Sequence, residues 1–370
     1  MAAPLLNHRH IFGLKADVKN NIHFLEEGVI LYPVGHTVVI HNLDTKQQRF
    51  ISGSHGGTTA GGKPPEITAI AVSPNKRYVA IGEKGTERAV CSIYDLRTLR
   101  RKKVLMNNDT QYHAREYVSL AFGPDNRTLL TQGGAPHWPL SNWSWAKEKE
   151  LAKMSIQTKN TVIYQCSFCP ADPTLICVTG KTLLLYFRLN TTPNECKFQA
   201  IEPNLFEHPP EDFVAHAWGD QKQCIIGSRE GGLLYMENTM FRAKLPPLPL
   251  NGRGISCMTS FANGFVLGCD EGTVLIYEKD EKEYYKLSRQ LNIDTLQNSN
   301  LPSGKIKNIA ISPNNEYMVL TLSNAQMYMV KLYDGDVLCS EDAKFDCIGQ
   351  NHTGPITGNN PDNSLAIPSA

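Results

Sequence analysis

Short apolar runs, each about the length of a β-strand, follow one another along the chain and are separated by polar turns. One turn motif recurs between two such runs at intervals of about fifty residues, most clearly at residues 71–75, 121–125 and 310–314, which read AVSPN, AFGPD and AISPN. Proline lacks an N–H and ends the incoming strand, and Asn or Asp tolerates the turn that follows. The motif therefore predicts the turn that joins the first two strands of a repeated unit.

Weaker copies of the motif at residues 167–171, 217–220 and 260–264 extend the pattern through the middle of the chain. A repeat of about 40–50 residues with four short strands is typical of a β-propeller of the WD-repeat kind. We expect an all-β fold, a seven-bladed WD-repeat β-propeller. Blade one covers about residues 20–52, and blades two to seven start near residues 67, 117, 162, 213, 255 and 306.

A ring of blades has to close, because closure protects the edges of its sheets from open pairing. Two apolar segments can supply the outer strand of blade seven, residues 10–14 and residues 344–348. We predict a single domain over residues 1–350 in which the N-terminal strand of about 10–14 closes the ring. Residues 351–370 then form the start of a further repeat that stops and a disordered tail, because the last twelve residues are polar and interrupted by proline.

Composition narrows the class of protein. The net charge of +1 is spread thinly over 370 residues, which argues against a basic face for nucleic acid. The N-terminus has no apolar signal-peptide region, and no apolar run approaches the ~20 residues that span a bilayer. We therefore expect no nucleic-acid or membrane partner and a cytoplasmic protein whose ten cysteines stay reduced.

Motifs for catalysis, metals and cofactors are missing from the sequence. Cys166 and Cys169 have the spacing of a metal or redox pair, but no second pair follows at ligand distance, and none of the eleven histidines has HExxH spacing. No phosphate-binding P-loop or Gly-x-Ser-x-Gly elbow occurs. The first strands at 68–71, 118–121 and 308–311 carry no carboxylate for a propeller hydrolase. We expect no catalytic residue, no metal, no cofactor and no enzyme activity.

Two segments are candidates for contact with a protein partner. Trp138 lies in a loop with prolines on both sides, where it either packs locally or anchors an interface, a place where Trp is enriched. Trp143 and Trp145 lie two apart in a predicted strand and point to one face, so at least one belongs to the core. The basic run Arg100, Arg101, Lys102 and Lys103 is either a solvated hairpin or a contact for an acidic partner such as tubulin.

The segments HIFGLKADVKNNI at residues 10–22 and IAVSPNKRYVAIG at residues 70–82 resemble the family of cilia- and flagella-associated protein 57, also called WD repeat-containing protein 65. The resemblance runs from about residue 10 to residue 358 and rests on strand and turn positions. It implies a scaffold of the motile-cilium axoneme with two propellers and a coiled coil, associated with the placement of inner dynein arms. Implied partners are axonemal proteins, namely inner dynein arm components and, as a further candidate, tubulin.

The end of the chain departs from this family pattern. Residues 350–358 resemble the first inner strand of another repeat, but a polar segment follows in place of a second propeller and coiled coil. We interpret this as a shortened isoform, which places any function of the coiled coil in question. A general cytoplasmic WD-repeat adaptor is the alternative function within binding proteins.

Overall fold

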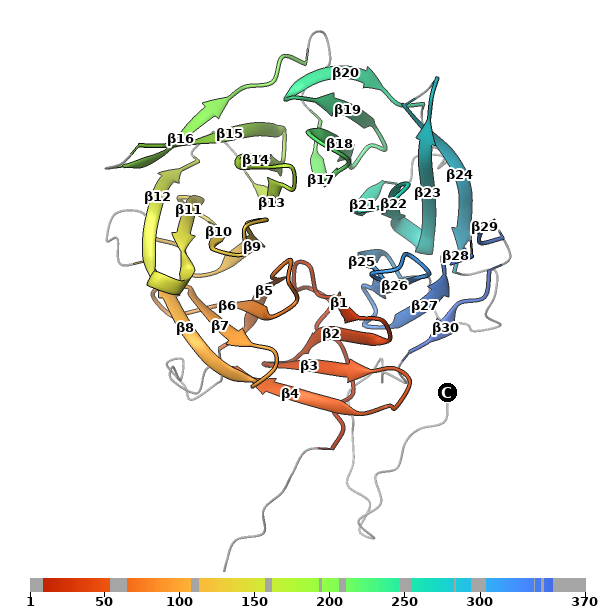
Figure 1. The fold of residues 1–370 in the computed structure, drawn as a ribbon, viewed down its shortest axis with the longest axis horizontal. Helices are drawn as coiled ribbons and strands as arrows, with labels where there is room; N and C mark the ends of the chain where they lie inside the picture. The colour runs from red at the N-terminus through yellow and green to blue at the C-terminus, as the bar shows by residue number, and fades with distance from the viewer. Residues whose placement is uncertain are drawn as a thin grey trace, which may run out of the picture.

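The computed structural model describes residues 9–53, 65–107, 113–156, 162–192, 195–205, 211–246, 254–282, 284–293, 304–335, 337–340 and 343–348. Its strands form seven four-stranded antiparallel sheets, arranged as the blades of a ring (Figure 1). The first strand of each sheet lies nearest the axis and the fourth lies on the circumference. The prediction of an all-β, seven-bladed propeller is confirmed.

The first four blades follow the chain in order. Blade one contains β1 (His23–Glu26), β2 (Val29–Val34), β3 (Thr37–Asn42) and β4 (Gln48–Ser52). Blade two contains β5 (Ile67–Val72), β6 (Tyr78–Glu83), β7 (Val90–Asp95) and β8 (Arg100–Met106). Blade three contains β9 (Tyr117–Phe122), β10 (Thr128–Gly133), β11 (Pro139–Ser144) and β12 (Lys149–Ser155), with the 3-10 turn η1 (Trp145–Lys147) before β12. Blade four contains β13 (Ile163–Cys169), β14 (Asp172–Gly180), β15 (Leu183–Thr191) and β16 (Cys196–Ile201).

The last three blades complete the ring. Blade five contains β17 (Phe213–Trp218), β18 (Gln223–Ser228), β19 (Leu233–Glu237) and β20 (Met240–Lys244). Blade six contains β21 (Ile255–Phe261), β22 (Gly264–Cys269), β23 (Thr273–Asp280) and β24 (Tyr284–Asn292), with η2 (Asp270–Gly272) before β23. Blade seven contains β25 (Ile306–Ile311), β26 (Tyr317–Leu322), β27 (Met327–Lys331) and β30 (Asp346–Cys347). A separate two-stranded hairpin, β28 (Tyr333–Asp334) and β29 (Val337–Leu338), lies between β27 and β30.

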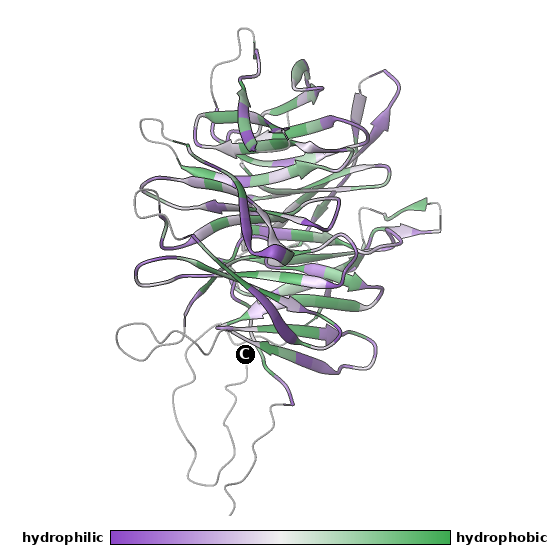
Figure 2. Ribbon diagram, turned by 60° about the vertical axis from the view of Figure 1, so that its left-hand side comes forward, coloured by the Kyte–Doolittle hydropathy of each residue, from purple (hydrophilic) through white to green (hydrophobic). Residues whose placement is uncertain are grey.

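The core is divided among the seams between blades. Seven clusters of buried apolar side chains occur in the described part of the chain, and each is shared by two adjacent blades. The second and third strands of a blade are therefore buried on both faces, as β6 and β7 are. Outer strands such as β20 alternate between exposed and half-buried positions, since one of their faces meets solvent. Figure 2 shows the apolar residues along the strands and many hydrophilic residues at the turns.

The repeated turn motif is held by its own polar side chains. In blade two, Ser73 Oγ donates to Asn75 Oδ1 (2.7 Å) and accepts from the amide of Tyr78 (2.9 Å). The motif also reaches the next blade, because the amide of Asn75 donates to Oδ1 of Asn126 in blade three (2.9 Å). The sequence motif therefore builds the turn and ties neighbouring blades together.

Blade seven is completed by the C-terminal part of the described chain. Its outer strand is β30, which pairs antiparallel with β27 and places Cys347 opposite Tyr328. The structure thus corrects the prediction that residues 10–14 supply the closing strand, since residues 344–348 contain it. Residues 349–370, predicted to hold the start of a further repeat and a disordered tail, lie outside the described residues.

Residues 10–14 instead lie along blade one, and the reason is their hydrogen bonding. The amide of Ile11 donates to Oε1 of Gln48 (2.8 Å), and the amide of Lys15 donates to the carbonyl of Pro33 (2.8 Å). Leu14 is buried in the cluster that blades seven and one share. The segment therefore seals the closing seam with side chains and adds no strand to blade seven. No helix in the described residues has the length and apolar character needed to cross a membrane.

Candidate interaction surface

Trp138, the predicted interface anchor, lies in the loop between β10 and β11. Its amide donates to the carbonyl of Gly134 (3.2 Å), and its own carbonyl accepts a hydrogen bond from Nε2 of Gln132 (3.0 Å). Its side chain is half-buried and packs against the cluster between blades three and four. The side chain of Trp138 therefore packs locally in part, and its role as an interface anchor stays a prediction.

A hollow of about 480 Å³ adjoins Trp138. Its polar lining includes Asp17, Glu66, Lys84, Glu116 and Tyr164. Most of its lining residues either precede the first strand of a blade or follow the second, so they share one face of the disc, which we call the Trp138 face. Sequence reasoning missed this hollow, because its residues come from blades two, three and four and from the segment before β1.

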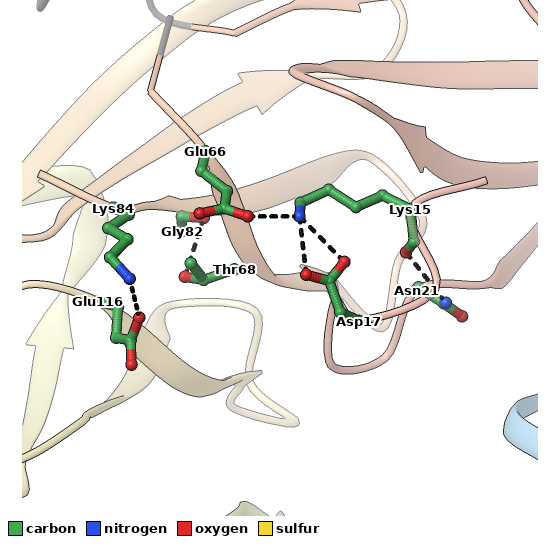
Figure 3. A network of polar contacts seen from close by, with 8 residues as sticks. All are labelled: Lys15, Asp17, Asn21, Glu66, Thr68, Gly82, Lys84 and Glu116. Carbon is green, nitrogen blue, oxygen red and sulfur yellow. Dashed lines mark hydrogen bonds and ion pairs between the residues drawn. The ribbon is translucent and has the colours of Figure 1, made fainter. Parts of the chain in front are cut away.

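Two ion-pair groups border the hollow (Figure 3). Nζ of Lys15 lies 2.9 Å from a carboxylate oxygen of Asp17 and 2.7 Å from one of Glu66, and Nζ of Lys84 lies 3.0 Å from a carboxylate oxygen of Glu116. Burial lowers the pKa of Lys15, but its hydrogen bonds to Glu66 and Asp17 outweigh this and raise the pKa overall. We call the space around the axis of the ring, inside the seven first strands, the channel. The carboxylates at this end of it are therefore already paired.

Blade five extends the same face. Nε of Arg229 lies 2.7 Å from Oδ2 of Asp212, and the guanidinium lies 5.8 Å from the centre of the Tyr164 ring. The Asp212 hydrogen bond raises the pKa of Arg229, and burial raises the pKa of the Tyr164 hydroxyl. A charged and aromatic group of this kind resembles the composition of many protein interfaces.

The predicted basic run lies on a different surface. Arg100, Arg101, Lys102 and Lys103 are all in β8, the outer strand of blade two, and not in the hairpin before it as predicted. The first three side chains are exposed, and Nζ of Lys103 lies 3.6 Å from a carboxylate oxygen of Glu148. We call these four residues the basic rim. The fold places it on the circumference, so the structure does not join it to Trp138 in one site.

The other two tryptophans of this region are structural. Trp143 and Trp145 are both buried, but Trp145 lies in η1 and not in a strand as predicted. Nε1 of Trp143 donates to Oγ1 of Thr131 (3.0 Å), and Nε1 of Trp145 donates to the carbonyl of Asn126 (3.0 Å). Each indole N–H therefore has a partner within blade three.

The opposite mouth of the channel contains a serine and a histidine in contact. Oγ of Ser167 lies 2.6 Å from Nε2 of His216, whose Nδ1 lies 3.0 Å from Oγ1 of Thr179, and Ser167 also accepts from Nε1 of Trp218 (2.8 Å). Burial holds the pKa of His216 at about 3, so its ring is neutral at pH 7. A catalytic triad would place a carboxylate where Thr179 stands. We interpret the group as a polar seam between blades four and five.

The hollow at this mouth has a volume of about 370 Å³, and no carboxylate lines it among the described residues. Cys166 and Cys169, the spaced pair of the sequence, are both buried and free. Within the described ranges, no three His, Cys, Asp or Glu residues are grouped so as to hold a metal ion.

The chain is similar in sequence to proteins of cilia and flagella. It is 30% identical to cilia- and flagella-associated protein 57 of Mus musculus over 97% of this chain and 32% of that protein. It is 26% identical to cilia- and flagella-associated protein 57 C of Tetrahymena thermophila over 94% of this chain and 31% of that protein. Human echinoderm microtubule-associated protein-like 1 is 23% identical over 60% of this chain and 27% of its own length. The chain thus spans about a third of the length of the first two relatives.

Among solved structures, a chain of the mitotic checkpoint complex has the same fold. The TM-score is 0.63 over 90% of this chain and 98% of that chain, at 9% sequence identity. At this identity the likeness concerns the fold alone. No protein-family model matches the chain.

Proposed function

Because this chain belongs to the family of cilia- and flagella-associated protein 57, we propose that it is a non-enzymatic scaffold of the motile-cilium axoneme that helps to position inner dynein arms. The observation that carries the proposal is the 30% identity that extends over 97% of the chain. The match covers all seven blades and is not confined to one motif.

The closed, packed ring supports a role as a scaffold. A ring whose seven seams are packed with apolar side chains is rigid, and its faces and circumference present separate surfaces to partners. The Ser167–His216 pair lacks the carboxylate that would activate it, which supports a role without chemistry. We propose inner dynein arm components and tubulin as the axonemal partners.

Two surfaces of the disc are the proposed contacts. The Trp138 face offers a half-buried indole beside paired charges, as at an interface where only part of an anchor residue is exposed. The basic rim offers three exposed cations, Arg100, Arg101 and Lys102, and suits an acidic surface such as that of tubulin. Contacts of the rim are expected to weaken as salt rises.

The first experiment tests the location. A tagged copy of the chain, expressed at low level in multiciliated cells, is expected along the ciliary shaft and in the axonemal pellet after detergent extraction. Tagged free fluorescent protein is the control for passive entry. A diffuse cytoplasmic signal that detergent removes would refute the axonemal role and favour the general adaptor.

A second experiment tests the role in dynein placement. Cells depleted of the endogenous protein are expected to lose inner arms in tomograms of the axoneme, and wild-type protein is expected to restore them. The variant Trp138→Ala and the triple variant R100E/R101E/K102E separate the two surfaces, because each changes one of them. Normal inner arms in depleted cells would exclude this part of the proposal.

A further inference from the structure

The hollow beside Trp138 is lined by two kinds of side chain. Trp138, Val162 and Tyr164 contribute aromatic and apolar surface from blades three and four. The charged side chains come from the segment before β1 and from blades two and three, and Figure 3 shows them in two groups around Thr68. With a volume of about 480 Å³, the hollow admits a long side chain of a partner but not a folded element.

The backbone of Trp138 is fixed in an uncommon conformation. Its φ is 47°, in the left-handed region that a bulky residue rarely adopts. The Trp138 amide donates to the carbonyl of Gly134, and the Trp138 carbonyl accepts from Nε2 of Gln132 and from the amide of Ile156 (3.3 Å). Backbone strain of this kind persists where the surroundings hold it, and it is often found at ligand contacts. The indole is thus held in place before a partner arrives, which lowers the ordering cost of binding.

The carboxylates of the hollow keep the capacity to accept further hydrogen bonds. All three N–H donors of the Lys15 ammonium are used, by both carboxylate oxygens of Asp17 (3.0 and 2.9 Å) and by Oε1 of Glu66 (2.7 Å). A carboxylate can accept about four hydrogen bonds. The Asp17 side chain is 70% exposed, whereas that of Lys15 is 15% exposed. A partner therefore meets the acceptor of this ion pair and not its donor.

Glu116 is the carboxylate most directly connected to Trp138. The amide of Gly134 donates to the carbonyl of Glu116 (3.0 Å), and the Gly134 carbonyl accepts from the Trp138 amide (3.2 Å). The Glu116 side chain is 41% exposed, and its ion pair with Lys84 uses Oε2. An exposed carboxylate and a fixed indole thus lie on either side of one glycine.

The lining as a whole is neither acidic nor basic. Lys84 and Lys19 line the hollow together with three carboxylates, and Lys15 borders it. Burial disfavours the charged form of Lys19 and lowers its pKa. A bare ion therefore gains little here. A planar, weakly hydrated cation with an apolar stem gains more, because it can stack on a ring and donate to a carboxylate at once.

The chain itself provides an example of this arrangement next to the hollow. The guanidinium of Arg229 lies 5.8 Å from the centre of the Tyr164 ring, and its Nε lies 2.7 Å from Oδ2 of Asp212. Tyr164 also lines the hollow. An aromatic ring and a carboxylate on this face thus already hold one arginine.

We propose that the hollow receives an arginine side chain of a partner protein, with its guanidinium stacked on Trp138 and hydrogen-bonded to Glu116. This inference rests on the proposed role of the Trp138 face as a contact surface and names the residue that the face recognises. Lysine is a poorer occupant, because its ammonium is strongly hydrated and has no planar group to stack.

The test is fluorine NMR of the full chain labelled with fluorotryptophan, which gives one signal for each of the four tryptophans. The substitution Trp138→Phe identifies the Trp138 signal. Titration with N-acetylarginine amide is expected to move this signal saturably, with a Kd on the order of 1 mM for a ligand of this size. The signals of the buried Trp143, Trp145 and Trp218 are expected to stay in place. N-acetylcitrulline amide, which has the same shape without the charge, is expected to cause no saturable shift.

Two variants test the carboxylate. Glu116→Gln is expected to weaken binding of N-acetylarginine amide about tenfold, because it removes a charge-assisted hydrogen bond. Glu237→Gln is the matched control, since it breaks an ion pair of the same length, 3.0 Å, on blade five, and it is expected to leave the affinity unchanged. The signals of the three buried tryptophans show whether each variant keeps the fold. If Glu116→Gln unfolds, the comparison of arginine with citrulline still decides.

Other outcomes count against the inference. Equal shifts with the arginine and citrulline amides would show that the charge is not recognised. Equal affinity for N-acetyllysine amide would identify a general cation site in place of an arginine site. A Trp138 signal that does not move would refute the inference but leave the axonemal role, which the location experiment tests separately. Arginine binding by a chain that stays out of the axoneme would refute that role alone.

Discussion

Asn21 and Asn308 are joined by a hydrogen bond of 3.1 Å across the seam where the ring closes, although they lie 287 positions apart in the chain. Nδ2 of Asn308 donates to Oδ1 of Asn21, which also accepts from Oγ1 of Thr321 (2.9 Å). Both asparagine side chains are buried. β30 pairs with only two residues of β27. The ring therefore also depends on side-chain contacts across the seam between blades seven and one, such as this hydrogen bond.

Asn21→Ala is expected to lower the free energy of unfolding by about 1–3 kcal/mol, because the buried Asn308 amide and the Thr321 hydroxyl lose their closer acceptor and keep only the more distant carbonyls of Val18 (3.5 Å) and Asn308 (3.4 Å). Urea denaturation measures the change. Asn190→Ala is the matched control, since its amide bonds Gln199 at an exposed position, and we expect it to stay within about 0.5 kcal/mol of wild type. An equal effect of the two variants would show that the asparagine pair does not hold the seam.

The N-terminal segment gives a second test of closure. Leu14→Ala is expected to lower the free energy of unfolding by about 2–5 kcal/mol, because the Leu14 side chain is buried in the cluster between blades seven and one. Phe12→Ala is the control, since Phe12 is 67% exposed and its loss leaves no cavity. An unchanged melting temperature of Leu14→Ala would show that residues 10–14 lie against the disc without stabilising it.

The buried His216 and the half-buried His23 make stability depend on pH. Burial is the main cause that holds the pKa of His216 at about 3 and that of His23 at about 4, whereas an unfolded histidine has a pKa of about 6.5. Below that value the unfolded chain binds more protons than the folded one, so stability falls as pH falls. A single histidine with such a shift lowers the free energy of unfolding by about 2 kcal/mol between pH 7 and pH 5.

We therefore expect His216→Asn to lose less stability than wild type between these two pH values, in urea titrations at each. The exposed His36 provides the control, and His36→Asn should keep the wild-type pH dependence. Identical pH dependence in all three proteins would contradict a neutral, buried His216.

The cysteines provide a chemical test. Burial raises the pKa of Cys166 and Cys257 to about 12, so these thiols are expected to resist alkylation in the native protein. Cys347 is exposed on β30 and should react first. Mass spectrometry after brief iodoacetamide treatment measures the order, and urea should expose the rest. Non-reducing spectra and metal analysis test the prediction that no disulfide forms and no zinc binds; a stoichiometric bridge or metal would refute it.

The repeat, the blade count and most of the strands could be predicted from the sequence, because the Ser-Pro-Asn turn is a local signal. Ser73 and Asn75 hold their turn with their own side chains, so the residue types alone specify it. The basic rim was placed in a hairpin by mistake, since exposed charged residues are equally compatible with a turn and with the outer strand of a blade. Trp145 was placed in a strand for a related reason, because spacing alone does not distinguish a strand end from a 3-10 turn.

The closure of the ring was decided by the tertiary structure alone. Residues 10–14 and 344–348 are both apolar, and only the hydrogen bonds of Ile11 and Lys15 to blade one leave the outer position of blade seven to β30. Asn21 and Asn308 are two ordinary asparagines in the sequence, 287 positions apart, and they meet because the ring brings its last blade back to the segment before its first strand. Local sequence determines which strands form, while the residues that meet at the closing seam are set by all seven blades together.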